Sequence, residues 1–294
     1  MKIIGFYIGF AFIWLFTLLP MRALYLISDF FYLIVYYLIG YRRKVVKDNL
    51  RHAFPEKSEA ETDELAKRFF RHFCDIMVET AKTIHLSQDE IQRRVKYINP
   101  EILYPYYEKG KSIVLVSGHY GNWEWMSNTP AVLKHHALAI YKPLRNEKFN
   151  KLVLKMRNRY SSRVQLVPMN EVFRVIIQYL QQKQVILTWF LADQSPPRNY
   201  PFRISFLNRE VPFFNGFEKV ARKFGHPVFY AQINKKSRGY YQVEFELLCD
   251  DPSSTEENEI TRKVVEVIEN TIRQQPEYWL WSHRRWKHAK ETPS

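Results

Sequence analysis

The chain begins with an apolar run that has no polar face. Ile3 to Leu19 contains no charged residue, and its aromatic side chains fall on all sides of a helix. The run lies at the short end of the roughly 17–25 residues that span a bilayer. A signal peptide is disfavoured because Pro20-Met21-Arg22 offers no small-residue cleavage site. A core helix at the protein surface is disfavoured because the run has no polar face to turn toward water. We therefore predict an N-terminal hydrophobic membrane helix.

A second apolar stretch, Ala23 to Ile39, contains Asp29. A charge in mid-span costs about 2.5–3.5 kcal/mol, so this stretch is predicted to be interfacial or partly embedded. A basic cluster follows at once, which indicates a cytoplasmic body or contact with anionic head groups: Arg42, Arg43, Lys44, Lys47 and Arg51. We expect residues 1–41 to form a membrane anchor with an interfacial apolar helix, and 42–294 to form one domain.

Helical periodicity dominates the first part of that domain. Apolar residues recur at spacings of three and four from Lys44 to about Ile84, with an interruption at Phe54-Pro55 and a new helix from about Ser58. Near the other end, Ser254-x-x-Glu257 has the form of a capping box. It predicts a closing helix that runs to the stop at Gln274-Gln275-Pro276.

Between these regions, short apolar runs alternate with amphipathic helical patterns at about 122–134, 147–160 and 171–182. The runs are 113–116, 138–141, 164–167 and 185–187, followed by 228–233 and 242–248 around a turn at Ser237-Arg238-Gly239. Strands that alternate with helices predict an α/β fold whose sheet is covered on both faces.

The charge balance narrows the partners. Lys and Arg number 44 against 30 Asp and Glu, a formal net charge of +14. Such an excess favours an acidic partner, which can be a nucleic acid, an anionic lipid or an acidic protein. The two cysteines, Cys74 and Cys249, form neither a disulfide framework nor a metal-binding spacing, so we expect core thiols in a reducing compartment.

The clearest candidate chemistry follows the first predicted strand of the sheet. There the chain reads Ser117-Gly118-His119-Tyr120-Gly121-Asn122-Trp123-Glu124. Loops after the carboxyl ends of such strands gather active sites, and a carboxylate near His119 would fix the imidazole tautomer and leave the other nitrogen free to take a proton. Two alternatives stay open. His119 could be a surface histidine near a helix start. It could also bind a metal, but the absence of a further ligand at a coordinating spacing argues against that.

The motif H-x4-D/E after a hydrophobic strand resembles the signature of the lysophospholipid acyltransferase superfamily. Over nearly its whole length the chain resembles one branch, the late acyltransferases of lipid A biosynthesis. The matching features are the apolar amino terminus, Arg42-Arg43-Lys44, 49–55, His119 with Glu124, Tyr141-Lys142-Pro143, Asn146, Arg157-x-Arg159, Ala192-Asp193-Gln194, 211–214 and 276–287. The resemblance implies a glycerolipid acyltransferase-like fold, a mixed sheet flanked by helices.

The resemblance also implies residue roles: His119 as general base with Glu124 as its partner, and Arg157, Arg159, Asp193 and Lys142 in substrate binding. Asp193 follows an apolar strand, where a charge needs a cationic partner, although a helix cap or structural ion pair would serve equally. Arg157 could instead lie on a solvated helix face. Lys142 stands where the family commonly has Arg, and it lacks the bidentate fork that suits phosphate.

The carboxyl-terminal run Trp281-Ser282-His283-Arg284-Arg285-Trp286-Lys287 interleaves aromatic and basic residues. Its tryptophans could pack in the core with the arginines exposed, or the run could contact lipid phosphates or an acidic carrier protein. A nucleic-acid surface is disfavoured because no recognised nucleic-acid-binding fold accompanies the run.

The resulting hypothesis is an enzyme of the bacterial inner membrane with its catalytic domain on the cytoplasmic face. It would move a fatty acyl chain from an acyl thioester, expected to be acyl carrier protein, to a hydroxyl of a lipid A precursor, without cofactor or metal. Backbone N–H groups near Asn122 are candidate oxyanion donors. The alternatives are an acyltransferase for another phospholipid, aminolipid or glycolipid, and a non-catalytic membrane adaptor with a basic binding face.

Overall fold

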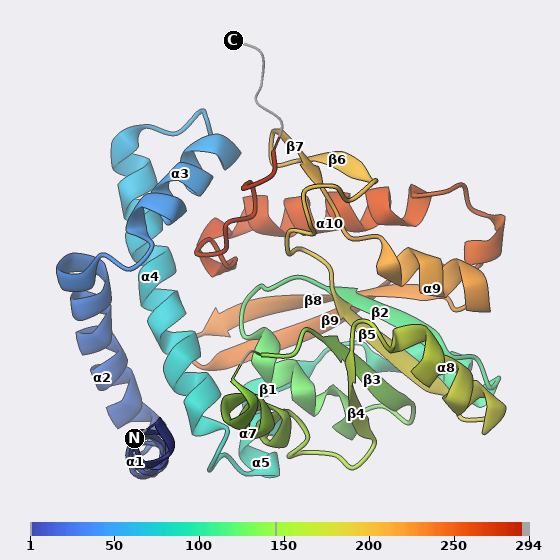
Figure 1. Cartoon of the computed structure of the whole chain (residues 1–294), viewed down its shortest axis with the longest axis horizontal. Coiled ribbons are helices and arrows are strands. Elements are labelled where there is room, and N and C mark those ends of the chain that lie inside the picture. The colour runs from blue at the N-terminus through green and yellow to red at the C-terminus, as the bar shows by residue number, and fades with distance from the viewer. Residues whose placement is uncertain (1, 145, 290–294) are drawn as a thin grey trace.

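The centre of the protein is a seven-stranded mixed sheet. The structure is a computed structural model that describes residues 2–144 and 146–289 (Figure 1). The strand order is β1-β9-β8-β2-β5-β3-β4, and β8 and β9 form the antiparallel pair while the other neighbours are parallel. The strands are β1 (Val95–Tyr97), β2 (Ile113–Ser117), β3 (His136–Tyr141), β4 (Val164–Pro168), β5 (Ile186–Leu191), β8 (Val228–Ser237) and β9 (Tyr240–Cys249). A separate hairpin consists of β6 (Arg203–Phe206) and β7 (Arg209–Pro212).

Helices cover both faces of this sheet, so the predicted fold class is confirmed. In Figure 1, α10 crosses above the sheet and α5 lies below it. The α-helices are α1 (Lys2–Phe16), α2 (Met21–Leu33), α3 (Arg43–Ala53), α4 (Glu59–Lys82), α5 (Gln88–Arg94), α6 (Tyr104–Glu108), α7 (Glu147–Arg157), α8 (Val172–Gln181), α9 (Gly216–Phe224) and α10 (Glu259–Gln274). The π-helix η1 (Ile34–Ile39) continues α2, and short 3-10 helices are η2 (Pro100–Leu103), η3 (Trp123–Ala131), η4 (Pro252–Ser254) and η5 (Pro276–Tyr278).

Strand β2 illustrates how the sheet is buried on both faces. Its side chains alternate between two apolar clusters: Val114 and Val116 contribute to one, and Ile113 and Leu115 to the other. All four are at most 1% exposed. A strand with two buried faces needs an unbroken apolar run rather than polar alternation, and that run is what the sequence offers.

Helix ends show where local sequence rules hold. The break at Phe54-Pro55 is confirmed: α3 ends at Ala53, and Ser58 caps α4 through a reciprocal capping box with Glu61. The predicted box at Ser254 is wrong. The Ser254 hydroxyl donates to the Asp251 carbonyl within η4, and α10 begins five residues later at Glu259.

Other departures concern short or irregular elements. The helix expected at 122–134 is a 3-10 helix, η3, over Trp123–Ala131, and Asn122 caps its first turn by accepting from the Trp125 N–H. Strands β1, β6 and β7 were not predicted, since three or four residues are too few to show a period. Both cysteines are free and buried, as expected of core thiols.

The amino-terminal helices differ from the simplest expectation. Helix α1 has 15 residues, about 22 Å at 1.5 Å per residue and shorter than the roughly 30 Å of a hydrocarbon core. Within residues 2–144 and 146–289, the helical segment long and apolar enough to cross a membrane is instead Met21–Ile39, which is compatible with membrane association. One face of α2 is buried, at Met21, Leu24, Ser28 and Tyr32.

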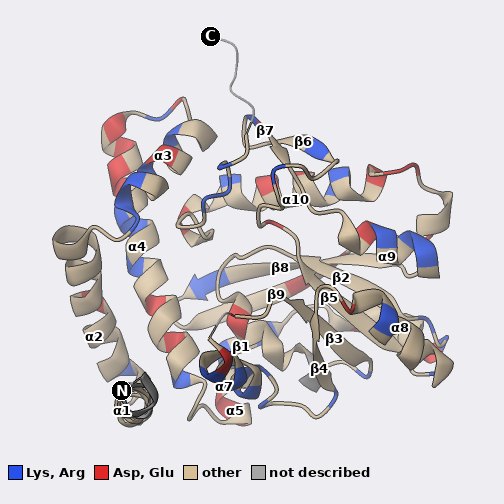
Figure 2. Cartoon of the chain, in the orientation of Figure 1, with Lys and Arg blue, Asp and Glu red and all other residues tan. Residues whose placement is uncertain are grey.

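The other face of these helices exposes large apolar side chains. Phe12 is 70% exposed, Leu26 73% and Leu38 79%. Figure 2 shows α2 almost entirely without charge, whereas basic residues recur along α3. An exposed apolar surface of this kind is typical of a membrane or protein contact.

The aromatic residues of the carboxyl-terminal segment (residues 276–289) belong to the core. Trp279, Trp281 and Trp286 are at most 6% exposed. Arg285 is fully buried, where it donates to the Pro212 carbonyl and lies over the ring of Phe213. Burial lowers the pKa of Arg285 to about 10. The packing interpretation therefore holds for the tryptophans and for the exposed Arg284, but it is wrong for Arg285, which is buried among the aromatic rings.

Candidate active site

His119 lies in a tight turn at the carboxyl end of β2, which we call the His119 turn (residues 117–124). Its glycines are required by close contacts. A Cβ on Gly118 would lie 3.3 Å from Asp193 Oδ2. Gly121 has a φ of +55°, and a Cβ at that position would lie only 2.9 Å from Ile233 Cγ2. The turn can bring its backbone this close only because both positions lack a side chain.

Asp193 is the carboxylate that holds His119. His119 Nδ1 is 2.6 Å from Asp193 Oδ1, and the His119 backbone N–H donates to Asp193 Oδ2 over 2.8 Å. Strands β2 and β5 are adjacent and parallel, and the Ala192 N–H donates to the Ser117 carbonyl, so the residues that follow the two strands meet at one edge. The partner expected for Asp193 is thus the imidazole of His119, which is a cation only when it is protonated.

The surroundings of Asp193 keep its carboxylate ionised. It is 2% exposed, and the Trp279 indole N–H also donates to Oδ2, over 2.7 Å. Burial alone would raise the pKa of Asp193, but the charge of His119 and the hydrogen bonds from His119 and Trp279 hold it at about 2. An ionised Asp193 accepts the Nδ1 proton and leaves a lone pair on Nε2.

The second ring nitrogen of His119 contacts the side chain of Gln194. Nε2 lies 2.9 Å from the side-chain amide nitrogen of Gln194, the residue after Asp193. The Trp123 ring meets the imidazole edge to face, with ring centroids 5.3 Å apart. A substrate hydroxyl that replaced Gln194 would therefore find an acceptor nitrogen whose orientation is already fixed.

Glu124 does not hold the imidazole as the sequence suggested. Its carboxylate pairs with Arg157 at the end of α7: Arg157 Nη2 donates to Oε1 over 2.6 Å and Nε to Oε2 over 2.9 Å. Both side chains are mostly buried, so Arg157 is not on a solvated helix face. A guanidinium that offers two parallel donors engages both carboxylate oxygens, which is the physical reason for this partner.

A narrow apolar cavity of about 50 Å³ lies beside this ion pair. Glu124, Arg157 and Trp123 line it, and the ring of Trp123 also contacts His119. Its other walls are side chains of β2, β3, β4 and β5, including Leu115, Ala139, Leu166, Leu187 and Leu191. The cavity has room for only a few water-sized molecules, so a long ligand must widen it.

The remaining predicted site residues lie at the surface. Lys142, just after β3, and Arg159, just after α7, are both exposed. The hydrogen bonds described for His119 and Asp193 do not include them. Substrate contact by either residue stays a prediction.

Sequence reasoning missed three side chains of the site. Gln194 and Trp279 were part of recognised motifs and Trp123 lay between His119 and Glu124, but none was given a role. A signal for Trp279 was available, because a buried indole N–H needs an acceptor and a buried carboxylate needs donors.

Together, the mixed α/β sheet and the buried histidine and aspartate beside an apolar cavity form the candidate active site. Residues 1–288 match the family described as bacterial lipid A biosynthesis acyltransferase, and the chain belongs to that family.

Curated relatives carry the corresponding names. The chain is 23% identical over 288 residues to "Lipid A biosynthesis lauroyltransferase" of Escherichia coli (strain K12), covering 97% of this chain and 92% of the relative. It is 23% identical over 282 residues to the "Lipid A biosynthesis palmitoleoyltransferase" of that strain, covering 95% and 90%. With the "Lipid A biosynthesis myristoyltransferase" it shares 24% over 240 residues, covering 79% and 71%.

Proposed function

We propose that this protein transfers a fatty acyl chain from an acyl thioester on acyl carrier protein to a hydroxyl of a lipid A precursor. The observation that carries the proposal is the oriented imidazole: Asp193 accepts from His119 Nδ1, and Nε2 is turned toward Gln194 beside an apolar cavity. Family membership supports the reaction class. The names of the relatives support the lipid acceptor.

In the proposed reaction, the acceptor hydroxyl takes the place of the Gln194 amide at His119 Nε2. His119 removes the hydroxyl proton as the oxygen attacks the thioester carbonyl carbon, and Asp193 stabilises the imidazolium that forms. The carbon–sulfur bond then breaks, and His119 returns the proton to the leaving thiolate. An ester and a free thiol are the products, so neither a cofactor nor an acyl-enzyme is required.

Negative charge on the carbonyl oxygen must be stabilised by donors. The first N–H groups of a helix have no partner within that helix, which makes those of η3 candidates. Two nearby groups serve other purposes: the Gly121 N–H donates to the Tyr278 carbonyl, and the Trp125 N–H is capped by Asn122. We assign the oxyanion to the first turn of η3, before Trp125.

The acyl chain would occupy the apolar cavity, widened by its entry. The Glu124–Arg157 ion pair at the cavity wall would hold the reacting end of the thioester, because its charges are fixed next to the His119 turn. Arg159 and Lys142 are exposed on neighbouring segments and would contact phosphates of the lipid or the carrier. Phosphate attracts both kinds of cation, although Lys lacks the Arg fork.

Residues 1–41 would seat the protein on the inner membrane, with the catalytic domain, residues 42–294, on the cytoplasmic face. The exposed apolar side chains of α1, α2 and η1 support insertion into the acyl region. The exposed Lys44 in the basic cluster follows directly and suits anionic head groups.

Mass spectrometry tests this function directly. The full chain in detergent is given lauroyl, myristoyl or palmitoleoyl acyl carrier protein, with a lipid A precursor, a lysophospholipid, an aminolipid or a glycolipid as acceptor. We expect one added acyl group on the lipid A precursor and none with His119→Ala. Acylation of another acceptor alone would replace the substrate and keep the chemistry. No transfer to any acceptor would favour a membrane adaptor.

A further inference from the structure

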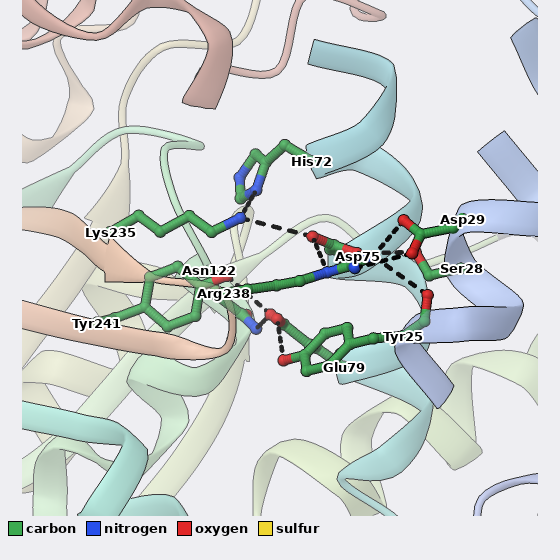
Figure 3. Close-up of polar contacts among 10 residues, drawn as sticks. All are labelled: Tyr25, Ser28, Asp29, His72, Asp75, Glu79, Asn122, Lys235, Arg238 and Tyr241. Carbon is green, nitrogen blue, oxygen red and sulfur yellow. Dashed lines mark hydrogen bonds and ion pairs between the residues drawn. The ribbon is translucent and has the colours of Figure 1, made fainter. Parts of the chain in front are cut away.

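Helix α4 carries a buried carboxylate that the proposed reaction does not use. Glu79 is 0% exposed, and its two oxygens accept from three neutral side chains. Tyr25 of α2 donates over 2.8 Å, Asn122 of the His119 turn over 2.7 Å, and Tyr241 of β9 over 2.8 Å. Figure 3 shows these groups converging on Glu79 from three separate elements. A buried carboxylate is costly unless it is hydrogen-bonded, so its retention here needs a reason.

Asn122 connects Glu79 to the reacting centre. Its side-chain nitrogen donates to Glu79, while its side-chain oxygen accepts the Trp125 N–H over 3.1 Å and so caps η3. Reversing the amide would break both bonds. The Trp125 indole reinforces the contact by donating to the Glu79 carbonyl oxygen over 3.3 Å. His119 lies three residues before Asn122, and Glu124 lies two residues after it.

The opposite side of the His119 turn is held independently. The Gly121 N–H donates to the Tyr278 carbonyl, and the Leu280 N–H donates to the His119 carbonyl. The turn is therefore clamped between α4 and the carboxyl-terminal segment. Loss of Glu79 would release one side and leave the other in place, so the turn would shift rather than unfold.

The same carboxylate reaches α2, the apolar helix that follows α1. Besides the Tyr25 bond, Ser28 of α2 donates to Asp75, one turn before Glu79 on α4, over 2.8 Å. Arg238 in the β8–β9 turn bridges Asp75 and Asp29. Figure 3 shows these contacts side by side along α4. Helix α2 is thus docked on the catalytic domain by polar contacts that a simple membrane anchor would not need.

We propose that Glu79 is a positioning residue for acyl transfer, which fixes the His119 turn through Asn122 and makes α2 part of that support through Tyr25. The proposal rests on the proposed function for its activity measurements. It adds that α2 contributes to the geometry of the site as well as to membrane attachment.

Charged groups face this cluster from several sides. Burial raises the pKa of Glu79 to about 7; the charge of Lys235 on β8 opposes that rise, and Asp75 adds to it. Arg94 of α5 donates to the Gly239 carbonyl beside Tyr25. The charge of Arg94 opposes the rise in the pKa of Tyr25 that burial causes. Glutamine at position 79 can keep the geometry without charge, since its oxygen can accept from Asn122 and Tyr241 while its amide donates to Tyr25.

The test compares variants of the full chain in detergent. We expect Glu79→Ala and Asn122→Ala each to lower kcat about 10- to 100-fold with little change in KM, the size of effect that a misplaced catalytic group produces. The double variant should be no worse than either single one, because both remove the same support. Glu79→Gln should stay within about twofold of the parent. Tyr25→Phe should lower kcat by about 3- to 10-fold with unchanged membrane attachment.

Hydrogen exchange supplies a readout that needs no activity. Amides of residues 118–125 should exchange faster in Glu79→Ala, while those of residues 279–281 stay protected. Glu64→Gln is the control on the same helix, since Glu64 is exposed, pairs with Lys67 and has no part in the Glu79 cluster; its kcat and the 118–125 exchange should be unchanged.

The outcomes separate cleanly. A parent chain without acyl transfer would refute the proposed function, and the exchange pattern would still decide the support role. Normal kcat in Glu79→Ala, equal damage in Glu79→Gln, or equal damage in Glu64→Gln would overturn the positioning role. Normal kcat in Tyr25→Phe would remove α2 from the proposal.

Discussion

Two buried carboxylates flank the His119 turn, and they differ in what neutralises them. Asp193 accepts from the His119 ring, the His119 backbone and the Trp279 indole. Glu79 also accepts three hydrogen bonds, but all come from neutral groups, two tyrosine hydroxyls and one amide. The pKa of Asp193 is held at about 2, while burial raises that of Glu79 to about 7.

The difference shows that hydrogen bonds alone do not keep a buried carboxylate ionised. Burial raises the pKa of both groups, and only Asp193, whose imidazole partner becomes a cation on protonation, is held below its ordinary value. The first therefore suits a reaction in which the imidazole gains a positive charge. The second suits support, where geometry matters more than charge.

The largest effect should come from removing the base itself. His119→Ala deletes the group at which the acceptor hydroxyl loses its proton, and we expect kcat to fall about 10²- to 10⁴-fold. His52→Ala, which changes a partly exposed histidine in the last turn of α3, is the matched control and should leave the rate unchanged. Steady-state kinetics with a defined acyl carrier protein donor would measure both. A near-normal rate in His119→Ala would refute the mechanism.

Asp193→Asn tests whether acyl transfer depends on the negative charge of the Asp193 carboxylate. Asparagine keeps the size but cannot stabilise an imidazolium, and its amide can offer a donor where Nδ1 needs an acceptor. We expect kcat to fall about 10²-fold, with the imidazole still present. Glu79→Gln, the same change on the other carboxylate, should have little effect on kcat. Equal losses in the two variants would erase the distinction.

Sequence patterns located both halves of this site but not their pairing. The strand before His119 and the strand before Asp193 were recognisable, and the need of Asp193 for a cationic partner followed from burial. The order in which strands lie in a sheet is a tertiary property, so nothing local shows that β5 lies beside β2. Glu124 was favoured because it is near in sequence. In the folded protein the Glu124 carboxylate instead pairs with Arg157, which is 33 residues away in the sequence.

Local rules failed in a similar way at helix ends. Ser58 and Ser254 both begin a capping-box pattern, yet only Ser58 caps a helix. At Ser254 the hydroxyl is drawn into the turn formed with Asp251. The amino-terminal helices could be predicted as apolar, but their docking on α4 depends on Tyr25 and Ser28, whose partners lie on a distant helix.

The third effect is thermodynamic and concerns Glu79. Its pKa is about 7 in the folded protein against 4.5 for an exposed glutamate, so between these values the native state binds more protons than the unfolded state. Stability should therefore fall as pH rises from 4.5 through 7, by up to about 3 kcal/mol at one pKa unit per 1.36 kcal/mol. Glu79→Gln should remove this loss. Thermal unfolding in detergent from pH 5 to 8 should show the two melting curves diverging with pH; parallel curves would contradict the assignment.

The smallest effect should come from Arg157, whose ion pair with Glu124 is intermediate between the two buried carboxylates. Here the charge is neutralised by a cation, as at Asp193, but both partners remain partly exposed. Arg157→Lys keeps the charge and loses the second donor, so the carboxylate is held at one oxygen and can rotate. We expect kcat/KM to fall about tenfold, the equivalent of roughly 1.4 kcal/mol. Lys155→Arg, on an exposed position of the same helix, is the control and should match the parent chain. A normal kcat/KM in Arg157→Lys would mean that charge alone serves at Glu124, whereas a loss as large as that of Asp193→Asn would place Glu124 with Asp193 in holding the reacting groups.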